Sequence, residues 1–340
     1  CQRRDEVKYM KILSFVVQIL VIVGSQALMN VMIVIFLVVQ TSMCVDDGRI
    51  ITTLKYSKYR VKPVVVNGEP VMNSKVPYLV SIKEMKYIKD IIVWTNLCGG
   101  SIIGVNKVVT AAHCFEGNNF KYAKEPEHLR VIAGTIYTDL LDSSGHNMRV
   151  LDETQWREIG KIVIHSDFVF PMNDIALVFV KNNWEYSEVV RYIRPARRTQ
   201  DYPYRCASAG FGGVDHSKIS EVSRVLLLAR IRVIPRWQCS VIWQMDMNSF
   251  VCSNSEFGDV ARGDSGGPLV CQDPRAIDED SPGREMLVGV VSGKNFDKTT
   301  LYTRVSAYHD WIERNCSYKI TAFLLNIIMQ LLNYFLFLFN

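Results

Sequence analysis

The sequence predicts an all-β domain of antiparallel strands, and its short β-rich runs carry this prediction. Between residues 65 and 317, runs rich in β-branched residues are separated by glycine, asparagine and aspartate; examples are Pro77–Ile82, Lys107–Thr110 and Leu287–Ser292. Runs of this length, bounded by turn residues, are typical of a barrel or a sandwich. All-β barrels of about 200–250 residues often form a single domain, so one domain can account for this segment.

The first 43 residues are predicted to be a hydrophobic leader. No charged residue occurs from Ile12 to Val45, and this stretch is longer than one membrane span requires. It divides into two apolar runs, the second beginning at Met29 or Met32, and either run fits a secretory signal peptide. The alternative is an uncleaved membrane anchor with its basic N-terminal residues in the cytoplasm. Both interpretations export the rest of the chain.

The segments on either side of the β domain are short. Residues 44–64 are interpreted as a propeptide, and Ser306–Arg314 as a C-terminal helix capped by its serine. Residues 318–340 form a hydrophobic tail, uncharged from Ile320 onward. This tail is interpreted as a membrane tail, as a lipid-anchor signal or as wrongly translated sequence. Membrane association through the hydrophobic termini is therefore an alternative to free secretion.

Charge and cysteine content exclude some classes of function. The net charge is +5 in 340 residues, and lysine and arginine are scattered, so no basic block favours nucleic-acid binding. There are nine cysteines, and they form neither CxxC pairs nor zinc-ligand spacings, so we expect no metal and no organic cofactor. Disulfides formed in an oxidising compartment explain the cysteines better and favour secretion. Nine is odd, so at least one cysteine is unpaired, bonded to another chain or removed by processing.

Three separated motifs indicate nucleophilic catalysis. Thr110–Cys114 contains a histidine, Asn173–Leu177 an aspartate, and Gly263–Val270 a serine between glycine and aspartate. Serine is a weak nucleophile at neutral pH and needs an adjacent base. Histidine titrates near neutrality and can take and return that proton, while a carboxylate orients the imidazole. Each motif alone has an ordinary structural explanation, but the three together do not.

These motifs resemble those of the trypsin/chymotrypsin family of serine proteases, over about 250 residues. The resemblance implies two six-stranded antiparallel β-barrels with the active site in the cleft between them, and a C-terminal helix. It implies Ser265 as nucleophile, His113 as general base and acid, and Asp174 as the orienting group. The interval from His113 to Asp174 is longer than usual for the family and predicts an inserted loop within Gly134–Arg157.

The resemblance also assigns residues around the serine. The backbone N–H groups of Gly263 and Ser265 match the oxyanion hole, and Ser292 matches a residue that lies against the catalytic aspartate and lines the substrate cleft. The cysteines match three family disulfides: Cys98–Cys114, Cys206–Cys271 and Cys239–Cys252. Cys1, Cys44 and Cys316 are left over.

The family's specificity residue precedes the serine by six positions and is Asp259 here. A carboxylate at the floor of a pocket would select arginine or lysine by charge pairing. The pocket walls differ from the family pattern, because a wall disulfide is missing and Lys294 and Thr300 replace small glycines. A lysine there could reach Asp259 and neutralise it, which would close the pocket to basic side chains or open it to acidic or small ones.

Activation also departs from the family pattern. The resemblance implies a zymogen in which cleavage frees Val65, whose ammonium pairs with Asp264. The preceding residue is Val64 instead of arginine or lysine. Either an activating protease with apolar preference cuts there, or the chain stays a zymogen.

The sequence is compatible with two classes of function. The first is an exported, monomeric serine endopeptidase with protein or peptide substrates and protein inhibitors as partners. The second is an inactive, protease-like binding protein with an occluded pocket. The complete set of His113, Asp174 and Ser265 favours the first.

Overall fold

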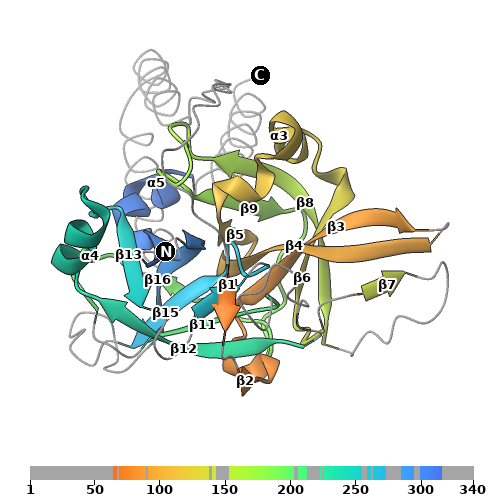
Figure 1. Cartoon of the computed structure of the whole chain (residues 1–340). Helices are drawn as coiled ribbons and strands as arrows, with labels where there is room; N and C mark the ends of the chain where they lie inside the picture. The colour runs from red at the N-terminus through yellow and green to blue at the C-terminus, as the bar shows by residue number, and fades with distance from the viewer. Residues whose placement is uncertain are drawn as a thin grey trace, which may run out of the picture. The chain divides into compact units, whose positions relative to one another are not determined.

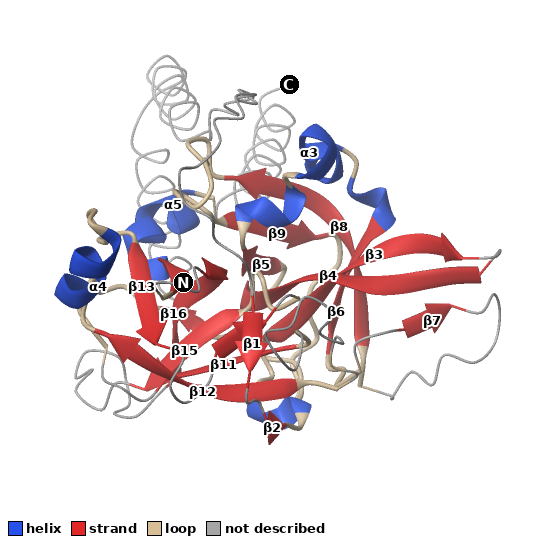
Figure 2. Cartoon of the chain, viewed as in Figure 1, coloured by secondary structure: helices blue, strands red, loops and turns tan. Residues whose placement is uncertain are grey.

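Two closed rings of six antiparallel strands organise the computed structural model, and strands dominate the ribbon drawing (Figure 2). The first ring runs through β3 (Leu79–Ile88), β6 (Leu129–Ala133), β8 (Gln155–Ile164), β9 (Ala176–Val180), β5 (Lys107–Thr110) and β4 (Ile91–Gly104). Pairing of β3 with β4 closes this first barrel.

The second barrel is built in the same way from the later part of the chain. It runs through β16 (Glu285–Lys294), β15 (Pro268–Gln272), β11 (Cys206–Gly210), β12 (Leu227–Ile234), β13 (Phe250–Asn254) and β17 (Thr300–Arg304). Pairing of β16 with β17 closes this ring. Figure 1 shows the two groups of strands as separate parts of one unit, which contains the described residues from 64 to 310.

Among the described residues, five further short strands lie outside the two rings. They are β1 (Val64–Val66), β2 (Glu69–Pro70), β7 (Leu140–Asp142), β10 (Arg194–Pro195) and β14 (Asp259–Ala261). Strand β1 pairs with β14 in a small ladder in which Val65 lies opposite Val260. The ladder therefore joins the segment expected to be freed by activation to the strand that carries Asp259.

Helices are few and short among the described residues. The α-helices are α3 (Gly117–Lys124), α4 (Arg236–Trp243) and α5 (His309–Arg314), and the 3-10 turns are η1 (Asn73–Lys75), η2 (Ala112–Phe115), η3 (Pro126–His128) and η4 (Val305–Tyr308). No helix in this part of the chain is long and apolar enough to cross a membrane.

Alternation of apolar and polar residues explains why these segments form barrel strands. In β12 the apolar side chains of Ala229, Ile231 and Val233 are buried, while Arg230 and Arg232 between them are exposed. Successive side chains of a strand point to opposite faces, so this spacing gives one face to the core and one to water. Buried valine, leucine and tyrosine side chains fill the second barrel in the same manner.

The predicted fold class is confirmed, whereas some element boundaries differ. The strand expected at Pro77–Ile82 begins at Leu79 and continues to Ile88, and the expected helix from Ser306 begins as the 3-10 turn η4. Ser306 does not cap that turn, because it lies inside it and Arg304 occupies the N-cap position.

The structure describes residues 64–66, 69–88, 91–137, 140–142, 153–202, 206–212, 223, 225–254, 259–261, 263–272, 285–294 and 299–315. The predicted leader, all of the propeptide except Val64, and the hydrophobic tail lie outside them, as do Cys1, Cys44 and Cys316. An inserted loop was expected within Gly134–Arg157. The described residues of this segment include β7, which pairs with the N-terminal part of β4.

Candidate active site

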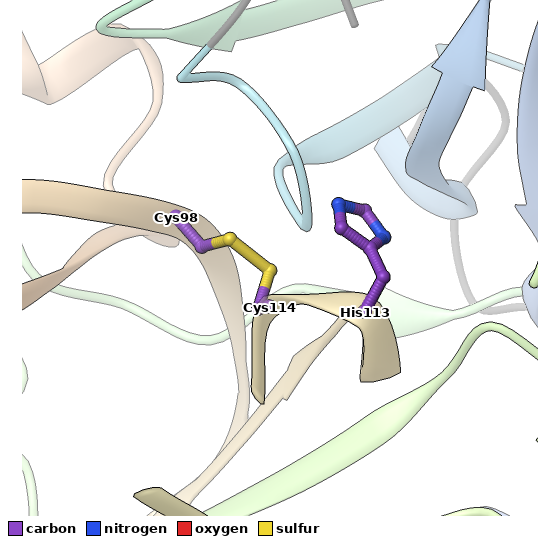
Figure 3. Close-up of side chains that lie close together, drawn as sticks. All are labelled: Cys98, His113 and Cys114. Atoms are coloured by element: carbon purple, nitrogen blue, oxygen red, sulfur yellow. A yellow bond between two sulfur atoms is a disulfide. The ribbon is translucent and has the colours of Figure 1, made fainter. Parts of the chain in front are cut away.

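His113 lies in the 3-10 turn η2, directly after strand β5 of the first barrel. Its neighbour Cys114 is bonded to Cys98 of β4, and this disulfide ties the turn to the barrel. The ring of His113 extends from the same turn and lies near the disulfide (Figure 3). The edge of its imidazole meets Phe170 at 5.5 Å between ring centroids. The turn and the aromatic contact together restrict the orientations open to the histidine.

Asp174 precedes strand β9, and its side chain is fully buried. Its Oδ2 lies 2.8 Å from Nδ1 of His113, and its Oδ1 accepts a hydrogen bond of 2.9 Å from the backbone N–H of His113. The hydroxyl of Ser292 donates to Oδ2 at 2.6 Å. Two partners therefore fix the carboxylate and, through it, the histidine ring, so that Nε2 is the imidazole nitrogen turned away from Asp174.

Burial and charge act in opposite directions on the pKa of His113. Burial lowers this pKa because it disfavours the imidazolium, whereas the charge of Asp174 and its hydrogen bond to the ring raise it. The net result is a pKa above the ordinary histidine value. The imidazole is thus a stronger base than a free histidine while it keeps its contact with the carboxylate.

Ser265 lies in the tight turn that precedes β15 of the second barrel, and only 6% of its surface is exposed. Its carbonyl oxygen accepts a 2.8 Å hydrogen bond from the N–H of Gly99, on β4 of the first barrel. Gly266 has φ +78°, and a Cβ there would meet Thr110 Oγ1 at 2.1 Å, so the turn requires glycine. Thr110 ends β5, three residues before His113, and the serine turn therefore packs against the strand that leads to the histidine.

Gly263 and Asn96 form a contact that no sequence motif predicted. Gly263 has φ +107°, which favours glycine. Its carbonyl oxygen accepts a 2.9 Å hydrogen bond from Nδ2 of Asn96, 167 residues away. Asn96 is held in turn by the hydroxyl of Ser81, which donates to its Oδ1 at 2.5 Å. Two strands of the first barrel thus hold the backbone beside the serine turn of the second.

Asp264, the residue before the serine, is a buried carboxyl group with 1% exposure. Burial raises its pKa to about 8, although a hydrogen bond from the N–H of Gly212 opposes this effect. A Cβ at Gly210 would lie 2.0 Å from its Oδ1, so glycine is needed there for the carboxyl group to fit. A buried acid of this kind becomes ionised more readily when a positive charge is placed beside it.

Asp259, Lys294 and Thr300 form a second buried cluster. Nζ of Lys294 forms an ion pair with Oδ2 of Asp259. Oδ1 of the same carboxylate accepts hydrogen bonds from the Thr300 hydroxyl at 2.5 Å and from the Val260 N–H at 2.9 Å. Burial raises the pKa of the Tyr302 phenol well above its usual value, and the nearby charge of Asp259 raises it further. The structure therefore brings the three residues of the expected pocket into direct contact.

The six cysteines assigned by resemblance form three disulfides in the structure. Cys98–Cys114 holds the histidine turn, Cys206–Cys271 joins the neighbouring strands β11 and β15, and Cys239–Cys252 joins helix α4 to strand β13. The candidate ligand atoms of Cys98, His113 and Cys114 lie within 4.8 Å of one another (Figure 3). Two of these atoms are sulfurs bonded to each other, so they cannot act as thiolate ligands, and one imidazole alone does not make a metal site.

Comparison with known proteins agrees with this geometry. The family model described as Trypsin matches residues 65–312. Chymotrypsin-C of Rattus norvegicus is 31% identical over 264 residues, which cover 73% of this chain and 87% of that protein. Tissue-type plasminogen activator of Homo sapiens is also 31% identical, over 246 residues, but these cover 64% of this chain and 39% of that protein. The chain belongs to the trypsin family of serine proteases.

Proposed function

We propose that this chain is an exported serine endopeptidase that hydrolyses peptide bonds through an acyl-enzyme, with His113, Asp174 and Ser265 as its catalytic triad. The observation that carries the proposal is the 2.8 Å contact between Nδ1 of His113 and the buried carboxylate of Asp174. This contact leaves Nε2 as the base, and the serine turn packs beside the same strand end. The proposed catalytic domain spans residues 65–317.

The geometry supports the following reaction. Oγ of Ser265 attacks the substrate carbonyl carbon while its proton passes to Nε2 of His113. The backbone N–H groups of Gly263 and Ser265 are the proposed donors to the oxyanion. The C–N bond then breaks as His113 gives its proton to the leaving amine. Water attacks the acyl-enzyme, passes a proton to His113 and releases the acid, and Ser265 regains its proton.

Activation of a zymogen is part of the proposal. Cleavage after Val64 would free the ammonium of Val65, which would pair with the carboxylate of Asp264. The burial and raised pKa of Asp264 support this step, because a buried acid gains most from a new cationic partner. The ladder between β1 and β14 already holds Val65 on the strand that carries Asp259. We further propose that the mature protein is secreted and monomeric. Its substrates would be proteins or peptides, and protein inhibitors would block it.

The proposal is tested by labelling the nucleophile. The full chain, with a specific protease site inserted directly before Val65, is cut and treated with a fluorophosphonate. We expect Ser265 to be labelled and peptide amides to be hydrolysed. Ser265→Ala should abolish both, whereas Ser166→Ala, at an exposed serine, should change neither.

A second candidate function is a binding protein with a protease fold. The closed cluster at Asp259 is the observation that favours it, because Lys294 and Thr300 already occupy the carboxylate that a basic substrate side chain would contact. The hydrogen bond between Nδ1 of His113 and Oδ2 of Asp174 argues against this second function. Folded, cleaved protein that is not labelled at Ser265 would favour the binding protein over the enzyme.

A further inference from the structure

A buried ion pair lies beside the proposed active site and has no part in the proposed reaction. The side chains of Asp259 and Lys294 are exposed by only 1% and 5%, respectively. Removing two charges from water is expensive, and replacing such a pair by apolar residues is often neutral or stabilising. Stability alone is therefore a weak reason for this pair, and its position calls for a functional explanation.

The position of the pair connects it with the substrate. Lys294 lies on strand β16, two residues after Ser292. The hydroxyl of Ser292 contacts Asp174. Thr300 lies directly opposite Lys294 in the ladder between β16 and β17, and both side chains reach Asp259. Asp259 in turn precedes Ser265 by six residues. The cluster is therefore joined to the proposed site through the chain, by β16 to Ser292 and by the segment from Asp259 to Ser265.

We propose that Lys294 and Thr300 close the specificity pocket over Asp259, so that the enzyme cleaves after small, uncharged residues and not after arginine or lysine. This inference rests on the proposed protease function and names its substrate class. Its support is that both carboxylate oxygens of Asp259 already have partners within the protein: the Lys294 ammonium, the Thr300 hydroxyl and the Val260 N–H.

A basic substrate side chain cannot compete well for this carboxylate. It would have to displace an ammonium that is tethered to the same protein and is therefore present at a high effective concentration. Displacement would also leave Lys294 buried without its partner, which is strongly unfavourable. An acidic side chain gains little, because the charge of Lys294 is already balanced by Asp259. The lysine stem and the threonine also fill volume that glycines would leave open, so small neutral side chains remain.

The first experiment profiles the cleaved full chain against peptides varied at the residue before the scissile bond. We expect cleavage after alanine, serine, threonine or valine to exceed cleavage after arginine or lysine by at least about tenfold, the factor that one lost charge-assisted hydrogen bond represents. Preferred cleavage after arginine or lysine, or after aspartate or glutamate, overturns the inference while leaving the protease function intact.

The second experiment opens the pocket. Lys294→Gly/Thr300→Gly should gain cleavage after arginine and lysine, because the contacts of Asp259 with Lys294 and Thr300 are then removed and the carboxylate can be reached. The matched control, Asp259→Ser/Lys294→Gly/Thr300→Gly, has the same space without the carboxylate and should not gain it. Fluorophosphonate labelling of Ser265 shows in each case whether the site has formed.

A third measurement does not depend on catalysis. Benzamidine, a small aromatic cation, is titrated against Ser265→Ala proteins with the wild-type pocket and with the opened pocket. We expect binding only to the opened pocket, with affinity at least about tenfold above that of the wild-type pocket. Equal binding to both overturns the inference even if the protein proves to have no protease activity. Absence of Ser265 labelling in the wild-type chain would instead count against the proposed function alone.

Discussion

Asp174 and Asp259 are both buried carboxylates, but their partners give them different roles. Asp174 contacts a histidine, whose ring can gain and lose a proton near neutral pH, and the hydroxyl of Ser292. Asp259 contacts the side-chain nitrogen of Lys294 in a buried ion pair, and the hydroxyl of Thr300. The comparison shows that burial does not by itself indicate the role of an acid. The partner decides whether the carboxylate supports proton transfer or is held in a fixed ion pair.

The largest expected effect tests the first carboxylate. Asp174→Asn keeps the shape of the side chain but removes its charge, so the histidine loses the group that orients and stabilises its imidazolium. We expect kcat for peptide hydrolysis to fall about 10⁴-fold, with thermal unfolding measured in parallel to show that the protein is folded. A folded variant that keeps nearly wild-type kcat would remove Asp174 from the mechanism.

The second prediction tests the locked ion pair by breaking it. Lys294→Met leaves the Asp259 carboxylate buried without its cation, and we expect the free energy of unfolding, measured by urea titration, to fall by about 3–5 kcal/mol. Asp259→Asn/Lys294→Met should recover most of this loss. In contrast, Lys181→Met removes an exposed ion pair with Glu158 and should leave the free energy of unfolding nearly unchanged, because solvent screens such pairs. Equal losses in the free energy of unfolding for Lys294→Met and Lys181→Met would contradict a buried ion pair between Lys294 and Asp259.

A smaller effect is expected at Asn96, which contacts neither carboxylate. Its hydrogen bond to the Gly263 carbonyl holds the backbone that carries the proposed oxyanion donor. We expect Asn96→Ala to reduce kcat about fivefold with little change in KM, since one hydrogen bond of about 1 kcal/mol is lost. Asn96→Asp, which keeps the shape but lacks the N–H donor, should be at least as harmful. A rise in KM with kcat unchanged would exclude this positioning role.

The smallest effect concerns pH. His113 must be neutral to accept the proton of Ser265, so kcat/KM increases as pH rises through the pKa of the histidine. Burial lowers this pKa, but the charge and hydrogen bond of Asp174, together with the charge of Glu116, raise it by more. We therefore expect the acidic limb of the pH profile, measured with an uncharged substrate, to lie above pH 6.5, and to move to lower pH in the residual activity of Asp174→Asn. An acidic limb at or below pH 6.5 in the wild-type protein would contradict this balance of effects.

The sequence predicted the fold class well because local patterns determine it. Short apolar runs with turn residues between them mark the strands, and the family resemblance supplied the two barrels, which the structure confirms. Strand ends were less predictable. The sequence indicated an end at Ile82, because Lys83 and Glu84 interrupt the apolar run, whereas β3 continues past both of them in its pairing with β4. The ladder pairing of a strand depends on its neighbour as well as on its own residues.

The residues of the candidate site could be predicted only in part from the sequence, for a related reason. His113, Asp174 and Ser265 stand in motifs that are distinctive within a few residues, so their roles could be predicted, and these roles remain predictions until the variants are measured. Asn96 has no distinctive neighbours, and its partner Gly263 is 167 residues away. Contacts of this kind arise from tertiary packing, and no local pattern in one sequence reports them.

The ladder between β1 and β14 has a consequence for the timing of the proposed activation. The bond between Val64 and Val65 lies inside a paired strand, with Val64 opposite Ala261 and Val65 opposite Val260. A protease can cut this bond only when the segment has left its ladder and entered the cutting enzyme, so local opening must come first. The rate of cutting is then governed by how often three residues come away from the sheet as well as by the sequence at the cut. Changes that weaken the ladder would shorten the lifetime of the uncut chain without altering the bond that is cut.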